Sequence, residues 1–169
     1  VLVLFLGILL VRTLLFTPKP GPKVSEDAIS FDRDEAVSNL QQLVRCKTIS
    51  YRDASLEDDG EFQNLIDLLP TLYPSVFEQC TFTQLEDRAL LFCWQGRTAG
   101  EPAVVMAHYD VVPVEEEGWD KPAFEGILEN GVLWGRGTLD TKVTMNGILF
   151  AVNHLIAQGF QPERTVYMA

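Results

Sequence analysis

The residues best suited to chemistry are His108 and Asp110, two positions apart, and the more distant Asp140. Side chains at positions i and i+2 of an extended segment point to the same side, so Asp110 is placed beside His108. A carboxylate that holds one ring nitrogen fixes the tautomer and makes the other nitrogen a better metal ligand. Asp140 follows the Gly135–Gly137 turn and is a second carboxylate suited to bridging two cations. Such a short pattern is also typical of a hydrogen-bonded structural histidine.

An apolar strand is predicted immediately before His108. Residues Pro102 to Ala107 form a continuous apolar run, which is typical of a strand buried on both faces of a sheet that helices cover. A helix is expected from Lys142 to about Gln158, and a strand begins at Thr165, so the order is strand, loop, helix, strand. In open α/β sheets ligands bind beyond the carboxyl ends of the strands, and His108 lies at such an end.

The other elements are predicted from the spacing of apolar residues. Helical spacing predicts helices at 34–46 and 60–73, the second of which contains Pro70. Strands are expected at 76–83, 89–95 and 132–134. The predicted fold class is therefore α/β, with a central sheet flanked by helices.

Composition excludes several classes of protein. The chain has 169 residues, of which 47% are hydrophobic and 22% charged, and this is typical of a globular domain with a core of its own. Its 13 basic and 24 acidic residues give a net charge of −11, which repels phosphate backbones, so no nucleic-acid partner is expected. The three cysteines are too widely spaced for a CxxC pair.

The N-terminal segment favours a membrane anchor. An apolar run extends from Val1 to Phe16 and only Arg12 interrupts it. A spanning helix needs about 20 apolar residues, so we expect 1–17 to be part of an anchor, or signal anchor, that begins upstream. A buried core helix is the alternative. Residues 18–30, rich in proline, are expected to be a linker. An anchored domain is expected outside the cytoplasm or in a lumen, in an orientation that the sequence does not fix.

A longer pattern surrounds the candidate site residues. It comprises residues 108–113 (HYDVVP), Gly118, Trp119, Pro122, Phe124, Gly126 and residues 131–142 (GVLWGRGTLDTK). In order and spacing this pattern resembles the di-zinc metallopeptidase family M20, which includes carboxypeptidase S, aminoacylase and N-acyl amino acid hydrolases. The resemblance extends from about Ala103 to Ala169, with a weaker likeness from Asp34 to Ser50.

The resemblance implies a zinc-peptidase-like sheet and specific roles for the three residues. It implies that His108 ligates one Zn²⁺, that Asp140 bridges two, and that Asp110 is the catalytic residue that orients His108. It also implies a cis peptide bond between Asp140 and Thr141. Co²⁺ and Mn²⁺ suit the same ligands.

The resemblance also implies an amide- or peptide-bond hydrolase of the carboxypeptidase or N-acyl amino acid hydrolase type. The family's general-base Glu, its neighbouring Glu ligand, a further acidic ligand and a final His follow a strand like Thr165–Ala169. We therefore expect residues 31–169 to be the N-terminal part of a catalytic domain and to be inactive alone.

The expected substrate is a small peptide or an N-acyl amino acid. The family's later lid domain implies a homodimer. The alternative function is a non-catalytic membrane-anchored module that keeps the fold without the complete metal site.

Overall fold

The computed structural model describes residues 1–18, 30–86 and 88–169, and the chain divides into two units, Val1–Ser30 and Phe31–Ala169. The first unit contains α1 (Leu2–Leu14), whose residues are all exposed. Among the described residues, no helix has both the length and the apolar character needed to cross a membrane. The transmembrane helix expected within 1–17 is therefore not supported. Most of the linker predicted at 18–30 lies outside the described residues.

Two capped helices begin the second unit. In α2 (Arg33–Arg45) the Asp32 carboxylate accepts a hydrogen bond from the backbone N–H of Glu35 at 3.0 Å, which satisfies one of the free donors at the helix start. Asp58 caps α3 (Asp59–Leu72) in the same way, and Pro70 lies inside that helix. Both helices agree with the predicted ranges to within one residue.

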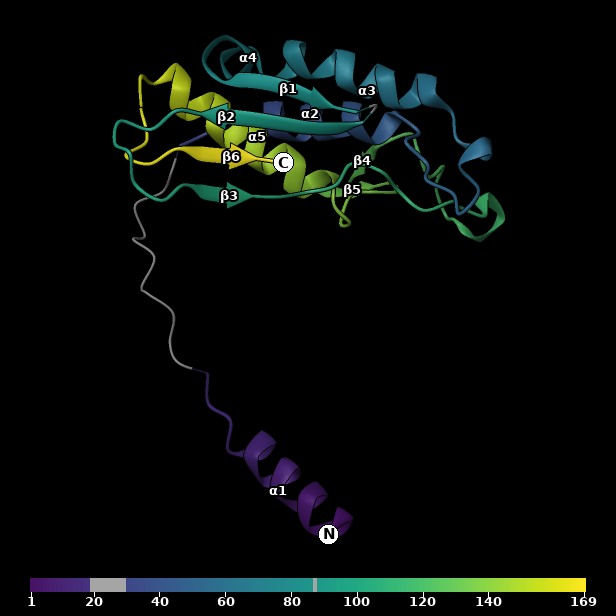
Figure 1. Ribbon diagram of the computed structural model, residues 1–169. Coiled ribbons are helices and arrows are strands. Elements are labelled where there is room, and N and C mark those ends of the chain that lie inside the picture. Colours follow the sequence, from purple (N-terminus) through teal and green to yellow (C-terminus); the bar gives the residue numbers. More distant parts are fainter. Residues whose placement is uncertain (19–29, 87) are drawn as a thin grey trace. The chain divides into compact units, whose positions relative to one another are not determined.

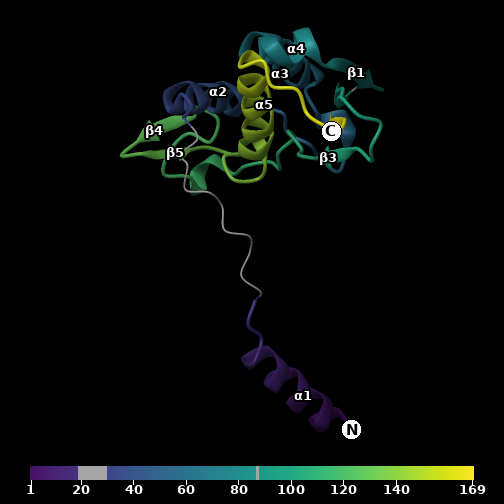
Figure 2. The same ribbon diagram turned by 90° about the vertical axis from the view of Figure 1, so that its left-hand side faces the viewer.

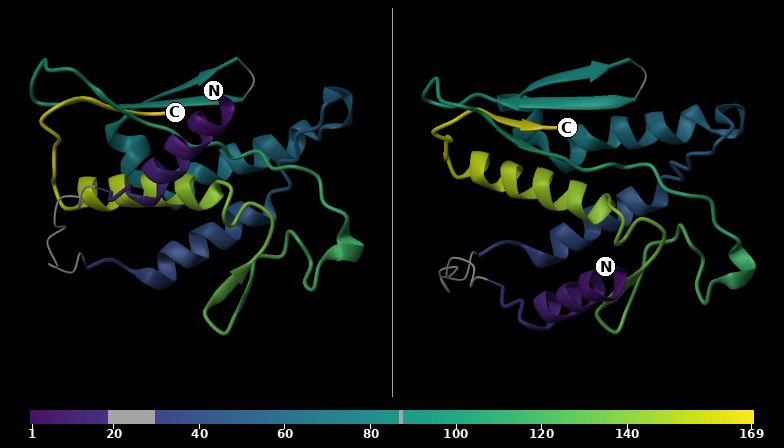
Figure 3. Two further views of the ribbon diagram at one scale, coloured as in Figure 1. Left: turned by 90° about the horizontal axis from the view of Figure 1, so that it is seen from below. Right: turned by 60° about the horizontal axis from the view of Figure 1, so that its bottom comes forward.

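The sheet has the strand order β1-β2-β6-β3 and is mixed (Figure 1). Its strands are β1 (Thr81–Leu85), β2 (Ala89–Trp94), β3 (Ala103–Val105) and β6 (Val166–Met168). The β3–β6 pair is parallel, and the β1–β2 and β2–β6 pairs are antiparallel. Alternate residues of β2 are buried toward the helices of the second unit, which lie on one side of the sheet (Figure 3). The predicted α/β class is thus confirmed.

The predicted burial of the strand before His108 is wrong. The strand is present as β3, but its residues are exposed, with Val104 at 58% and the following Met106 at 72% of full exposure. Among the described strands β3 lies at the edge of the sheet and pairs with β6 alone.

The first half of the segment predicted as a strand, 76–83, is helical. Residues Pro74–Gln79 form α4, and β1 starts only at Thr81. Pro74 is suited to the first position of a helix, and the backbone N–H of Ser75 donates to Asn153 Oδ1 at 2.8 Å. Because this cap comes from a distant helix, local sequence does not reveal it.

A hairpin and a long helix complete the unit. The hairpin joins β4 (Ile127–Glu129) to β5 (Val132–Trp134), and α5 spans Lys142–Ala157, close to the predicted helix. The hairpin lies beside α2, where Gln41 Nε2 donates to the Gly126 carbonyl at 2.7 Å (Figure 2).

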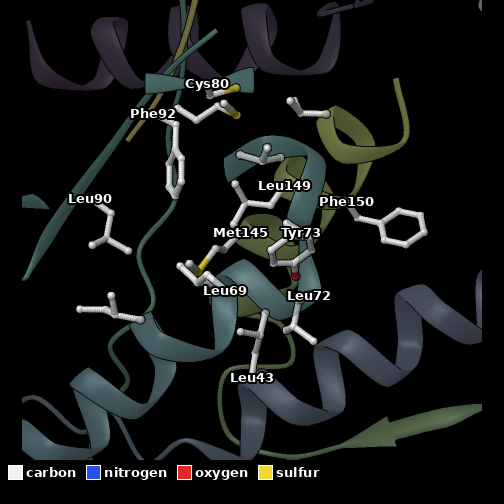
Figure 4. Close-up of a cluster of buried hydrophobic side chains, with 14 of the residues drawn as sticks. Leu43, Leu69, Leu72, Tyr73, Cys80, Leu90, Phe92, Met145, Leu149 and Phe150 are labelled. Carbon is white, nitrogen blue, oxygen red and sulfur yellow. The ribbon is translucent and has the colours of Figure 1, made fainter. Parts of the chain in front are cut away.

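The core lies between the helices and the sheet (Figure 4). It contains apolar side chains from α2, α3, α4, α5, β2 and β6, among them Leu43, Leu65, Val76, Phe92, Leu149 and Met168. A polar link crosses it, because the fully buried Tyr73 donates its hydroxyl to Asn146 Oδ1 at 2.7 Å. Asn146 Nδ2 in turn donates to the Ala36 carbonyl at 3.0 Å, so α5 is bonded to the end of α3 and to α2.

We expect Tyr73→Phe to lower the free energy of unfolding by about 1–3 kcal/mol, since it leaves Asn146 Oδ1 buried without a donor. Equilibrium urea denaturation measures the change. Tyr51→Phe is the matched control, because the Tyr51 hydroxyl has no hydrogen-bond partner within the part of the chain that the structure describes. Equal effects of the two changes would contradict the role given to the Tyr73–Asn146 bond.

Candidate functional site

The three side chains singled out in the sequence meet in space. His108 Nδ1 lies 3.0 Å from Asp110 Oδ1, and His108 Nε2 lies 3.0 Å from Asp140 Oδ1. The imidazole therefore stands between the two carboxylates. This arrangement agrees with the expected convergence of the three residues, and their roles in binding or catalysis stay predictions.

The parallel strands β3 and β6 position His108. Pairing continues beyond the end of β3, because the Ala107 backbone N–H donates to the Ala169 carbonyl at 3.0 Å. The histidine thus follows directly from the carboxyl end of a strand, as predicted.

Asp140 is brought to His108 by the segment that follows β5. The Asp140–Thr141 peptide bond is cis, as the resemblance implied. Thr141 Oγ1 accepts a hydrogen bond from the His108 backbone N–H at 3.1 Å and donates to the His108 carbonyl at 2.9 Å. These two bonds join the segment that contains His108 to the segment that contains Asp140.

Lys142 anchors the same segment from the other side. The side chain is fully buried, and its ammonium donates to the carbonyls of Leu43 at 2.8 Å and Cys46 at 2.6 Å. Burial lowers the pKa of Lys142 to about 8, although the nearby ionisable groups of Cys46, Glu61 and Asp110 act to raise it. The carbonyls at the end of α2 carry partial negative charge, which favours a cation there.

The prediction of the site from sequence missed Lys142. A signal was present, since a lysine in the first turn of a helix opposes the helix dipole. Such a residue is expected there only if its charge has a partner elsewhere in the fold.

The environment of His108 favours its protonated form in the absence of a metal. Partial burial disfavours the imidazolium, but hydrogen bonds to the Asp140 carboxylate and the Asp110 carbonyl, together with the charges of both carboxylates, outweigh it. The pKa of His108 is consequently raised above its ordinary value.

The imidazole nitrogen of His108 and the carboxylate oxygen of Asp140 are atoms that can bind a metal ion. Two acceptors of Asp110, its carbonyl at 3.1 Å and its carboxylate at 3.0 Å, hold a hydrogen on Nδ1. In the protonated imidazole Nε2 donates a hydrogen to Asp140 Oδ1, and in the neutral tautomer it directs a lone pair toward that oxygen, so a metal cation can take the place of the hydrogen. Imidazole and carboxylate are both ligands of zinc. Among the residues that the structure describes, however, no group of three or more His, Cys, Asp or Glu is arranged to hold a metal.

Two cavities adjoin His108 and Asp110. The larger, of about 470 Å³, is lined mostly by apolar side chains such as Phe62, Leu90 and Met145. The smaller, of about 200 Å³, contains Asp140 and the turn at 135–139. His108 and Asp110 thus line both cavities, and Asp140 lines the smaller one.

Comparison with known proteins places these residues in a family. Residues 104–169, which include the whole candidate site, match "Peptidase family M20/M25/M40". The "Probable carboxypeptidase S-like 2" of Dictyostelium discoideum is 33% identical over 98% of this chain and 34% of its own length. Residues 104–169 thus match peptidase family M20/M25/M40. The resemblance seen in the sequence is thereby confirmed.

Two further proteins show how far the likeness extends. The human "N-fatty-acyl-amino acid synthase/hydrolase PM20D1" is 29% identical over 90% of this chain and 32% of its own length. An "M20 family metallo-carboxypeptidase" from Sulfolobus solfataricus has the same fold, with a TM-score of 0.60 at 21% identity over 82% of this chain and 30% of that one. The chain spans about a third of the length of the curated relatives that it matches.

We expect the buried charge of Lys142 to make stability depend on pH. The pKa is about 8 in the folded state against an ordinary 10.5, so between these values the unfolded state binds more protons and stability rises with pH. The unfolding free energy of the wild type, minus that of Lys142→Met, should increase by about 2 kcal/mol from pH 8 to pH 10.

Urea denaturation at each pH measures this difference. Lys121→Met, which removes a half-buried lysine paired with Glu129 on the hairpin, controls for the loss of a lysine elsewhere. The unfolding free energy of the wild type minus that of Lys142→Met could instead stay level or fall from pH 8 to pH 10. That result would contradict the destabilising effect assigned to the buried ammonium.

Proposed function

We propose that this chain carries part of the active site of a metal-dependent hydrolase that cleaves an amide or peptide bond beside a free carboxylate. The observation that carries the proposal is the placement of His108 between Asp110 and Asp140, at 3.0 Å from each, within the segment that matches the family. The names of the relatives, a probable carboxypeptidase and an N-fatty-acyl-amino acid synthase/hydrolase, support small peptides or N-acyl amino acids as substrates.

In this proposal each residue has a distinct task. His108 Nε2 and the Asp140 carboxylate hold Zn²⁺, and Asp110 keeps the hydrogen on Nδ1 so that Nε2 is free to bind. When bound, zinc supplies Lewis acidity toward the substrate carbonyl and the attacking water. Thr141 fixes the backbone of His108 through its two hydrogen bonds.

Two ligands are too few for a complete catalytic centre. A catalytic zinc takes about three protein ligands and one water, and a pair that shares a bridge needs more. We infer that the remaining ligands and the general base belong to a part of the protein outside this chain, and that the chain alone does not turn over substrate. The alternative, a module that keeps the fold without catalysis, predicts no metal-dependent hydrolysis by the whole protein.

The test uses the full-length protein, with metal analysis and hydrolysis of N-acyl amino acids and short peptides. Chelation should abolish activity and zinc should restore it. Asp110→Asn should reduce activity or zinc affinity by about 10- to 100-fold, because the carboxylate acts through the histidine, and His108→Ala should reduce both further.

His154→Ala is the matched control, because His154 lies on α5 and is hydrogen-bonded to Gln158, away from the site. Hydrolysis that survives both chelation and His108→Ala would contradict the metal mechanism. Absence of any hydrolysis by the zinc-loaded protein would favour the non-catalytic module.

A further inference from the structure

Tyr109, which lies between His108 and Asp110, takes part in two short hydrogen bonds that involve side-chain hydroxyls. Its own hydroxyl donates to the Arg88 carbonyl at 2.6 Å, and its carbonyl accepts a hydrogen bond from Thr48 Oγ1 at 2.6 Å. These bonds hold both the side chain and the backbone of Tyr109. Because successive side chains of an extended segment point to opposite sides, a fixed Tyr109 also sets the direction of His108 and Asp110.

The hydroxyl of Tyr109 is bonded to a residue that is itself anchored. The Arg88 guanidinium forms ion pairs with Glu57 and Asp59, and its central carbon lies 3.7 Å from the centre of the Phe62 ring. The rings of Phe62 and Tyr109 are in edge-to-face contact, with their centres 6.0 Å apart. The carbonyl that accepts the Tyr109 hydrogen therefore belongs to a residue whose side chain is held by ionic and aromatic contacts.

The backbone of Tyr109 is bonded to a segment that pairs with the site. Thr48 is fully buried, and its carbonyl accepts a hydrogen bond from the Val111 backbone N–H at 2.8 Å. The Ser50 backbone N–H donates to the Val111 carbonyl at 2.9 Å, within a short parallel bridge. Tyr109 and Val111 are thus bonded to the same segment, and Asp110 is held between them.

This segment is also bonded to the other half of the site. The Cys46 carbonyl accepts a hydrogen bond from Lys142 Nζ at 2.6 Å, and Lys142 follows Asp140 by two residues. Residues 46–48 therefore support the distant carboxylate through Lys142 and the histidine segment through Tyr109.

We propose that Tyr109 is a positioning residue for the metal site. Its two hydrogen bonds keep His108 Nδ1 bonded to Asp110 and His108 Nε2 directed toward Asp140. The effect on zinc binding and hydrolysis rests on the proposed function. Groups that orient a ligating histidine alter metal affinity although they do not touch the metal. Without the hydroxyl bond the segment 108–110 shifts, and Nε2 shifts with it.

Tyr109 also lines the larger cavity, but the hydrogen of its hydroxyl is already donated to the Arg88 carbonyl. The hydroxyl therefore has no hydrogen left for a bond to the substrate. The two roles differ in their kinetic effects, because a positioning residue alters zinc affinity and kcat, whereas a residue that binds the substrate alters KM.

The experiment compares Tyr109→Phe with the wild type in the full-length protein, because this change removes the hydroxyl and keeps the ring that contacts Phe62. Competition with a chelator should show a loss of zinc affinity of about 3- to 10-fold, smaller than the loss caused by removing a group that contacts the histidine ring. Hydrolysis of an N-acyl leucine at saturating zinc should show a lower kcat with little change in KM. The visible absorption of the Co²⁺-substituted protein should change, because it reports the geometry of the ligands.

The matched control is Tyr73→Phe, which removes a tyrosine hydroxyl bond in the core, that to Asn146. It should lower stability and leave the zinc affinity and the Co²⁺ spectrum unchanged. Thr48→Val should lower zinc affinity as Tyr109→Phe does, and Thr48→Ser, which keeps the hydroxyl, should restore it.

Several results on a zinc-binding wild type would overturn the inference while the proposed function stands. One is a zinc affinity and Co²⁺ spectrum that Tyr109→Phe leaves unchanged. Another is a loss of zinc affinity that is equal in Tyr109→Phe and Tyr73→Phe, since this would follow from lower stability alone. A change confined to KM would assign the hydroxyl to substrate binding instead.

A measurement on the metal-free protein separates the inference from the proposed function. A wild type that neither binds zinc nor hydrolyses substrate contradicts the proposed function, and the His108 ring then decides the inference. Proton–nitrogen NMR of the ring, assigned through its absence in His108→Ala, follows the exchange of the Nδ1 hydrogen that Asp110 holds. Faster exchange in Tyr109→Phe than in Tyr73→Phe and the wild type supports the inference. Exchange that is equal in the two variants overturns it.

Discussion

The candidate site depends on the two hydrogen bonds that the buried ammonium of Lys142 donates to backbone carbonyls. A charge without access to water is costly unless its hydrogen bonds are satisfied, and here the carbonyls of Leu43 and Cys46 accept them. Because these carbonyls lie at the end of α2, the bond fixes the start of α5 against another helix. Asp140 stands two residues before Lys142, so the position of this carboxylate follows from the packing of two helices.

A second constraint acts on the other half of the site. The bond from Ala107 to Ala169 keeps His108 in line with the parallel strands, and the two bonds with Thr141 attach its backbone to the Asp140 segment. The site is therefore assembled from α2, the end of β3 and the start of α5, which are far apart in the sequence. Its geometry therefore depends on contacts between elements that are distant along the chain.

The sequence predicted the parts whose signals are local or regular. The apolar spacing of α2, α3 and α5 reflects the faces that pack in the core, and the His-x-Asp spacing reflects the alternation of an extended segment. Helix α4 was missed because Asn153 of α5 caps it, and the burial of β3 was misjudged because an apolar run does not reveal its place in the sheet. Lys142 was missed for the same kind of reason, since its partners are about a hundred residues away.

The turn at 135–137 helps to position Asp140. A Cβ at Gly135 would lie 2.6 Å from a methyl carbon of Val44 on α2, so only glycine lets the turn approach that helix. Gly137 has a φ of +91°, which other residues rarely adopt, and a Cβ there would lie 3.0 Å from Val111 and 3.1 Å from Lys142. Two glycines pressed against the core thus leave Arg136 between them and Asp140 just after them, both at the small cavity. These backbone constraints therefore help to place the candidate metal ligand Asp140 beside His108.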